Sequence, residues 1–283
     1  MKVILSRKGF DSGYGGYPSL IMPDNEMITL PIPSSGDQVF YSEVKTKKGL
    51  PLINIMKDLK PTIKSGKTVK LNNKTTCHLD PDLSFHSYKR LPGWRGAFGQ
   101  ISAAQKVLEN NNIKEGDLFL FFGWFNDVEI ANKYTFKKGD GRHTLFGYLQ
   151  IDKIIHPNQD KVPDWLTYHP HAHNNKRLEK NSNCIYIARE TCSFNENIKG
   201  YGLFAYNEEL DLSKKGMTRT KWDLPDIFRS VKMTYHSEDS WKEDHFKSAC
   251  RGQEFVIEEN EDIEKWAIKL IEKYSVNKEI IKN

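Results

Sequence analysis

The chain has 283 residues, of which 38% are hydrophobic and 12% aromatic, so it can bury a substantial core as one large or two small domains. Its net charge of +5 is compatible with a polyanionic partner but lies far below that of a protein that coats nucleic acid. No segment approaches the roughly 18 apolar residues of a membrane span, and the opening apolar run is too short for a signal peptide. We therefore expect a cytoplasmic protein with no membrane partner.

Apolar runs bounded by turn residues predict strands, whereas apolar residues at helical spacing predict helices. The expected strands span residues 1–6, 116–125, 143–155, 184–188, 201–206 and 253–259, together with a hairpin over 18–33 that turns at 23–25. The expected helices span residues 98–110 and the segment capped by Asn260, whose apolar stripe is Ile263, Trp266, Ala267, Leu270 and Ile271.

These elements predict a mixed α/β (α+β) fold with a central, mostly buried β-sheet, flanking helices and long loops. No internal repeat and no low-complexity linker interrupts them, so we expect a single domain over residues 1–283. The loop over 157–182 leaves open a division into two lobes.

The first expected strand ends abruptly in a glycine-rich run, SRKGFDSGYGG, which carries Arg7, Asp11 and Ser12. Glycines permit unusual backbone torsions and a close ligand approach, and the amides of such a loop can cradle a phosphate or a carboxylate. The run matches neither the P-loop nor the dinucleotide-binding fingerprint. A structural turn and an anion-binding loop are both open interpretations.

Two further segments combine histidines with carboxylates. In HLDPD, His78 and Asp80 stand beside a second carboxylate; such a pair can hold a divalent cation or divide acid and base roles, although Asp-Pro is also an ordinary turn. In YHPHAH, His169 and His171 alternate, and on an extended segment they would point the same way. Metal binding, a polar active-site wall and a surface position all remain open for these histidines.

The segments PGWRG and RGQEFV add residues suited to nucleotide chemistry. The first is expected to approach a helix N-terminus and form an anion site, with Trp94 available for stacking and Arg95 for a phosphate. In the second, Arg251 and Glu254 enter a buried strand, and such a pair is often structural. Alternatively, Gln253 reads a base edge while Glu254 tunes or transfers a proton.

Taken in order, the blocks SRKGFDS, GG-PS-I-PD, LPIP, HLDPDL, PGW, FGQ, GDLFLFFGWF, YHPH and RGQEFV resemble the nucleotide-modification-associated domain of the third type. The resemblance runs from Met1 to about Ile271. Leu20 departs from the pattern, because a second proline is expected there, and this puts only the local loop shape in doubt. That family is known mainly from genomic association with phage and bacterial systems that hypermodify DNA bases. The resemblance therefore implies nucleobase or nucleotide modification.

In this setting we predict an enzyme of DNA base or nucleotide modification in phage or bacterial defence systems, acting by group transfer or glycosidic chemistry on a nucleotide or flipped base in a loop-built pocket. The expected catalytic residues are Asp11, Asp80, Glu254 and His169. The expected substrate-binding residues are Arg7, Ser12, His78, Gln100, Gln105, His171, Arg251 and Gln253. Trp94 and Trp124 are candidate stacking platforms.

Two other functions stay open. A non-catalytic reader of modified bases in DNA would need the same pocket but no acid or base. A metal-dependent nuclease would rest on HLDPD and the histidines, but the sequence lacks a spaced Asp and Glu-x-Lys signature for it. The expected partner is DNA or a nucleotide; no metal ligand is assigned, and the residues identify neither a cofactor nor a protein partner.

Overall fold

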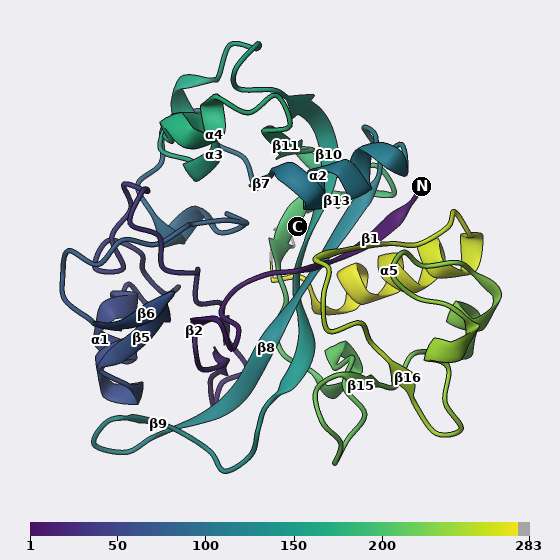
Figure 1. Ribbon diagram of the computed structural model, residues 1–283, viewed down its shortest axis with the longest axis horizontal. Helices are drawn as coiled ribbons and strands as arrows, with labels where there is room; N and C mark the ends of the chain where they lie inside the picture. Colours follow the sequence, from purple (N-terminus) through teal and green to yellow (C-terminus); the bar gives the residue numbers. More distant parts are fainter. Residues whose placement is uncertain (277–283) are drawn as a thin grey trace, which may run out of the picture.

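A computed structural model describes residues 1–276 and contains a large mixed sheet (Figure 1). Its main strand order is β17-β1-β8-β10-β11-β7. These strands are β17 (Glu254–Val256), β1 (Val3–Arg7), β8 (Leu118–Ile130), β10 (Arg142–Ile155), β11 (Cys184–Ala188) and β7 (Ala97–Gln100). Attached to them are β3 (Ser19–Ile21), β4 (Met27–Ile28), β9 (Tyr134–Phe136) and β14 (Tyr201–Leu203). The predicted mixed α/β class is confirmed.

Small sheets and helices surround this large sheet. The small sheets join β2 (Tyr14–Gly15), β5 (Thr62–Ser65) and β6 (Lys67–Lys70); β12 (Thr191–Cys192) and β13 (Asn195–Lys199); and β15 (Lys221–Trp222) and β16 (Phe246–Lys247). The α-helices are α1 (Leu52–Leu59), α2 (Ser102–Asn110), α3 (Pro170–His173), α4 (Asn175–Leu178) and α5 (Glu261–Tyr274). The 3-10 helices are η1 (Phe85–Ser87), η2 (Asp164–Leu166), η3 (Glu208–Leu210), η4 (Asp226–Ser230) and η5 (Glu238–Ser240). Within residues 1–276, no helix has the length and apolar character needed to cross a membrane.

Residues 118–123 of β8 are buried on both faces, as the apolar run over 116–125 predicted. Leu118, Leu120 and Phe122 pack in the same cluster as the apolar stripe of α5. The alternate residues Phe119 and Phe121 pack with Phe98 and Tyr186 on the other face. Figure 1 shows α5 alongside β1, whereas α1, β5 and β6 lie on the other side of β8.

The same edge of β8 pairs with two strands in succession, which explains the abrupt end of the first strand. Residues 3–7 of β1 run parallel to 118–122, and residues 19–21 of β3 run parallel to 125–127. Between these pairings the backbone of Lys8 crosses Gly123 so closely that a Cβ atom there would lie 2.7 Å from the Lys8 carbonyl oxygen. The glycine-rich run therefore leaves the sheet and returns to it, and the resulting loop borders a cavity.

Two local predictions are wrong. The helix expected from residue 98 begins at Ser102, because Ala97–Gln100 is buried and pairs with β11 as strand β7. The histidine segment is not extended throughout, because Pro170 opens the short helix α3. A proline at the first helical position has the required φ and loses no hydrogen bond there.

The predicted cap of the last helix is confirmed. Asn260 precedes α5, and its side-chain oxygen accepts from the backbone N–H groups of Asp262 and Ile263 at 2.9 and 3.2 Å. The predicted hairpin over 18–33 also forms, with β3 and β4 antiparallel and Asn25 at positive φ in the turn. The segment over 157–182 contains η2, α3 and α4, and the number of domains stays a prediction.

Candidate functional site

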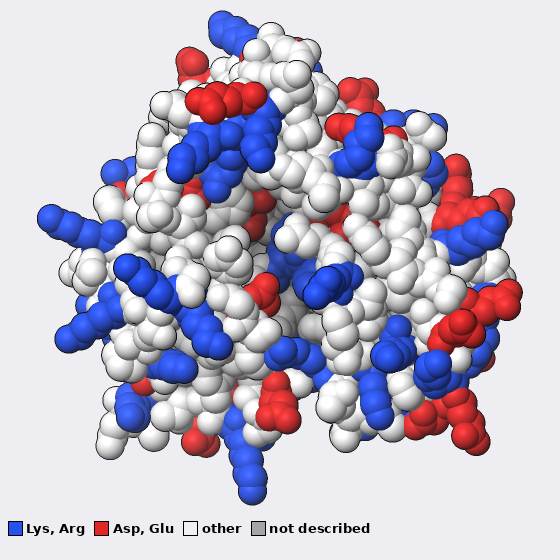
Figure 2. Space-filling model, viewed as in Figure 1, with Lys and Arg blue, Asp and Glu red and all other residues white. Residues whose placement is uncertain are grey.

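A cavity of about 970 Å³ lies at the ends of β1 and β7, beside residues 250–253, which directly precede β17. Five separate segments supply most of its wall: residues 7–14, 32–34, 78–80, 99–101 and 250–253. Figure 2 shows a hollow near the centre of this face with Lys and Arg side chains at its rim. The predicted site residues that line this cavity are Arg7, Asp11, Ser12, His78, Asp80, Gln100, His171, Arg251 and Gln253.

The glycine-rich loop is both a structural turn and part of the cavity rim. Asp11 Oδ1 accepts from the backbone N–H groups of Gly13 and Tyr14 at 2.7 and 2.6 Å, which closes an Asx-type turn. Gly15 has φ +81°, and a Cβ atom there would lie 2.0 Å from the ring of Phe10. The exposed Asp11 carboxylate keeps Oδ2 without a hydrogen bond to the described residues.

The predicted phosphate-binding residues Arg7 and Arg251 occupy different positions. Arg7 donates to the carbonyl oxygens of Ala249 and Cys250 at 2.6 and 3.0 Å, and so fastens the loop before β17 to β1. Burial lowers the pKa of the Arg7 guanidinium, although the nearby Asp11 opposes the shift. Arg251 is exposed on the cavity wall and forms no hydrogen bond or ion pair with residues 1–276. It is therefore the cation more available to a ligand.

Glu254 lies directly behind the cavity wall and is fully buried. Its Oε1 atom accepts from Lys8 Nζ and from Gln100 Nε2, each at 2.6 Å. The structural pair considered from the sequence, Arg251 with Glu254, does not form; Lys8 supplies the cation instead. Glu254 thus fixes two side chains that line the cavity, while its Oε2 has no hydrogen-bond partner in the described chain.

Asp80 lies among histidines at the cavity wall. Its Oδ1 accepts from the Gly99 N–H at 2.8 Å and is 3.2 Å from His169 Nε2. Burial raises the pKa of the Asp80 carboxyl, but the His169 hydrogen bond and the nearby histidines lower it overall to about 2. His169 is fully buried behind Asp80 and does not line the cavity, so its contact with the cavity is through that carboxylate.

His171 packs closely against Gly99 of β7. A Cβ atom on Gly99 would lie 2.3 Å from His171 Cδ2, so this close approach requires glycine. His171 Nδ1 is 2.7 Å from Asn183 Oδ1, and Asn183 Nδ2 donates to the His171 carbonyl oxygen at 2.8 Å. Burial lowers the pKa of His171 well below its usual value despite the opposing charge of Asp80, which keeps the imidazole neutral.

His78 is held by the buried carboxylate of Asp37. His78 Nδ1 is 2.8 Å from Asp37 Oδ2, and Arg177 of α4 also pairs with Asp37. Burial raises the pKa of Asp37, but the hydrogen bonds from His78 and Arg177 lower it overall. The carboxylate is therefore charged and orients the His78 ring.

Other predicted residues lie away from the cavity. Gln105 is buried on α2, where its Oε1 accepts from the Tyr186 hydroxyl at 3.0 Å. The anion site expected around PGWRG is wrong, because that segment leads into β7 rather than into a helix. Trp94 is buried and donates to the Tyr168 hydroxyl at 2.7 Å, and Arg95 pairs with Asp152. Trp124 does line the cavity.

Several cavity residues were not predicted from the sequence. Lys8 lies in the glycine-rich run between the predicted residues Arg7 and Asp11, so its position in the sequence could have identified it as a cavity residue. Arg219 lies outside every motif, yet its guanidinium carbon is 4.0 Å from the ring centre of Trp124. Asp37 and Arg177 are also outside the motifs, and only the folded chain brings them to His78.

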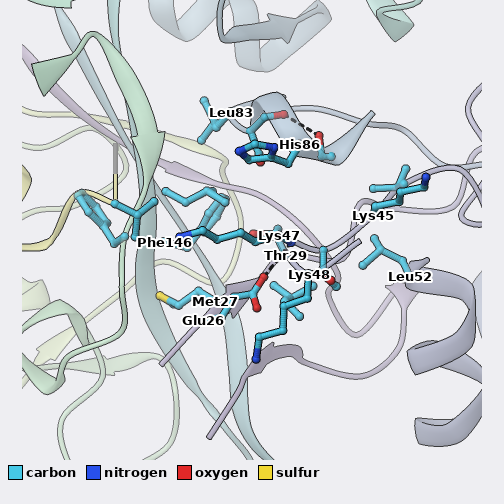
Figure 3. Close-up of a pocket in the computed structure, with 18 of the residues that line it drawn as sticks. Glu26, Met27, Thr29, Lys45, Lys47, Lys48, Leu52, Leu83, His86 and Phe146 are labelled. Carbon is cyan, nitrogen blue, oxygen red and sulfur yellow. Dashed lines mark hydrogen bonds between the residues drawn. The ribbon is translucent and has the colours of Figure 1, made fainter. Parts of the chain in front are cut away.

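A second cavity of about 740 Å³ contains none of the predicted site residues. Figure 3 shows its apolar wall, including Met27, Leu83 and Phe146, and three lysines at its border. The backbone N–H of Lys47 donates to Glu26 at 3.1 Å, and Lys48 is paired with Asp24. The residues suited to nucleotide chemistry therefore gather at the first cavity, which we call the polar cavity.

The fold and the polar cavity define a mixed α/β protein with a cavity lined by cations, amides, carboxylates and imidazoles. Residues 2–258 match the family model of nucleotide modification associated domain 3, and the chain belongs to that family. The resemblance inferred from the ordered motifs is thereby confirmed, and the name of the family associates it with nucleotide modification. Neither the curated proteins nor the solved structures that were compared gave a match.

Proposed function

We propose that the protein binds a nucleotide, either free or extruded from DNA, in the polar cavity and modifies its base. The observation that carries this proposal is the convergence of most predicted site residues, from distant segments, on one cavity within the family-matched part of the chain. A volume of about 970 Å³ accommodates a nucleotide, since small-molecule pockets span about 300–1,000 Å³.

The cavity offers a group for each part of a nucleotide. Arg251 and Arg219 are cations suited to phosphate, which guanidinium groups bind with directed hydrogen bonds. The amides of Gln100 and Gln253 can both donate and accept, as recognition of a base edge requires. Trp124 supplies an aromatic surface for stacking, and one face of its ring is in cation–π contact with the Arg219 guanidinium.

Among the predicted catalytic residues, Asp11 is the carboxylate best placed for acid–base work. It is exposed at the cavity rim, and Oδ1 is held by the turn while Oδ2 accepts no hydrogen bond from the described residues. Ser12 follows it on the same rim. Glu254 and His169 act from behind the wall in this proposal, as positioning residues for Gln100 and Asp80.

The test is mass spectrometry of nucleosides from DNA and from a nucleotide pool after incubation with the protein and a small-molecule extract that supplies co-substrates. We expect a mass shift or a released base with the wild-type chain. Asp11→Asn removes the acid–base group but keeps the oxygen that closes the turn, so turnover should fall by at least about 100-fold. Asp226→Asn, which removes an exposed carboxylate on η4, is the matched control and should retain activity.

One result contradicts an enzymatic role, and another contradicts the role of Asp11. If no product forms but the wild-type chain retains DNA with modified bases, the protein is a reader of such bases. If Asp11→Asn and Asp226→Asn both leave turnover unchanged, the carboxylate at the rim is not the acid or base.

A further inference from the structure

Three side chains on the wall of the polar cavity bring metal-binding atoms close together. His78 and Asp80 come from the segment between β6 and η1, and His171 comes from α3. One donor atom of each lies within 4.8 Å of the other two. His78 Nε2 is 3.7 Å from Asp80 Oδ2. We call these three residues the His-Asp-His cluster; the sequence left metal binding open for each of the two segments but did not join them in one site.

The hydrogen bonds of His171 leave the lone pair of its imidazole on Nε2. The Asn183 amide nitrogen donates to the His171 carbonyl oxygen, so Asn183 Oδ1 accepts from His171 Nδ1 at 2.7 Å. A neutral imidazole that donates through Nδ1 has Nε2 as its acceptor. No hydrogen bond within residues 1–276 uses this Nε2 atom.

The other two members of the cluster are held in a similar way. His78 Nδ1 contacts the Asp37 carboxylate, which also pairs with Arg177. Asp80 Oδ1 accepts from the Gly99 N–H, which leaves Oδ2 for the cluster. Histidines that bind metals almost always direct the other ring nitrogen to a carboxylate or a carbonyl oxygen, and this contact fixes the ring. The cluster has that arrangement at both histidines.

An ordinary ion pair between histidine and aspartate explains the cluster less well. The separation of 3.7 Å between His78 Nε2 and Asp80 Oδ2 exceeds hydrogen-bond distance. The hydrogen bond of Asp80 to a histidine goes instead to His169, behind the cavity wall. The cluster therefore presents two imidazole nitrogens and one carboxylate oxygen to the same space without satisfying them among themselves.

We propose that the His-Asp-His cluster binds one divalent transition-metal ion whose remaining coordination positions face the polar cavity. Two imidazoles and one carboxylate are the protein ligands of catalytic Fe(II) and Zn(II) sites, which keep positions for water or substrate. Ligand atoms about 2.1 Å from one ion lie about 3–3.5 Å apart, so binding draws the three side chains together by about 1 Å. Action of the ion on a nucleotide rests on the proposed function, whereas ion binding does not.

The test uses the full chain without an affinity tag, stripped with a chelator and titrated with Co(II) in the absence of nucleotide. Calorimetry and visible absorption should both show one ion bound per chain. Zn(II), and Fe(II) in excess without oxygen, should compete with Co(II) for the same site. A wild-type chain that binds none of these ions overturns the proposal.

Variants show whether the ion occupies this cluster. His78→Gln and Asp80→Asn should each weaken Co(II) binding by at least about 100-fold, since even a change behind the ligands costs about 10–100-fold. Asp37→Asn, a change behind the ligands, should weaken Co(II) binding by about 10–100-fold. His86→Gln, which removes an exposed histidine outside the polar cavity, is the matched control and should bind as the wild type does.

Circular dichroism of each variant confirms its fold. If Asp80→Asn does not fold, His78→Gln decides the test, because the His78 side chain is partly exposed at the cavity. Equal Co(II) binding by His78→Gln, His86→Gln and the wild type means adventitious binding and overturns the proposal. Because the titration contains no nucleotide, its failure is distinguishable from failure of nucleotide binding.

Discussion

At the scale of single residues, His143 shows how burial controls the charge of a histidine near the polar cavity. It is 5% exposed, and its ring lies against Phe122 and Trp222. Trp222 Nε1 donates to His143 Nδ1 at 3.1 Å, which requires an unprotonated nitrogen. Burial, with the positive charges of Arg7 and Arg219, lowers the pKa of His143 to about 3. The folded chain thus holds this imidazole neutral.

His143 is expected to make stability depend on pH in the acidic range. Between about pH 6.5 and the folded-state pKa of about 3, the unfolded chain binds a proton that the folded chain does not. The free energy of unfolding therefore falls as the pH falls, by up to about 1.4 kcal/mol per pH unit from this residue. Urea unfolding at pH 7 and pH 5 measures the loss, which should be about 2 kcal/mol larger in the wild type than in His143→Gln.

Glutamine is the appropriate replacement because its side-chain oxygen can still accept from Trp222. The exposed-site variant His86→Gln should lose as much stability on acidification as the wild type. An identical loss in the wild type and His143→Gln would show that His143 does not contribute to the pH dependence.

At the scale of elements, the contact between β7 and α3 positions part of the candidate site. Gly99 of β7 supplies the N–H that holds Asp80, and its missing side chain makes room for the His171 ring. Gly99 thus positions two members of the His-Asp-His cluster, Asp80 and His171. This contact joins segments that are distant in the sequence.

Substitution Gly99→Ala should therefore push His171 away from β7. The added methyl group would lie 2.3 Å from the ring, and overpacking of this kind costs about 1–3 kcal/mol of unfolding free energy. Chemical denaturation measures this cost. Gly13→Ala is the matched control, because its nearest contact would be 3.4 Å and its φ is not positive, so a change below about 0.5 kcal/mol is expected. Equal stability of both variants would mean that the ring shifts without cost.

The sequence predicted elements well where one local pattern determines them. The long apolar runs of β8 and β10 identify strands buried on both faces, and the stripe after Asn260 identifies α5. The prediction of a helix at residues 98–100 was wrong, because their conformation depends on pairing with β11, which lies far along the chain. Local periodicity carries no information about such a pairing.

The residues of the candidate site were likewise predicted correctly where a local pattern marks them and missed where only the long-range fold places them. Motif residues next to glycines or strand ends, such as Asp11 and Gln100, do line the polar cavity. Gln105 does not, because one helical turn beyond the strand its side chain points into the core toward Tyr186. Arg219 reaches the cavity from a segment with no local signal, since only the long-range fold brings it to Trp124.

At the scale of the whole molecule, the modest net charge of +5 conceals a local concentration of cations. Arg7, Lys8, Arg177, Arg219 and Arg251 all border the polar cavity, but most of them are already engaged by carbonyl or carboxylate oxygens or by an aromatic ring. Arg251 differs because it has no bonded partner within the described residues. It is therefore the side chain on which phosphate binding should depend most.

The most direct measurement is equilibrium binding of deoxynucleoside 5′-monophosphates to the wild type, Arg251→Gln and Arg229→Gln. Arg229, which is half-exposed on η4 and outside the cavity, controls for the lost charge. A hydrogen bond to a charged group contributes about 1.5–3 kcal/mol, so Arg251→Gln should weaken binding about 10–100-fold while Arg229→Gln binds as the wild type does. No binding by the wild type would contradict recognition of a free nucleotide in the polar cavity, and equal weakening in both variants would contradict the role of Arg251 there.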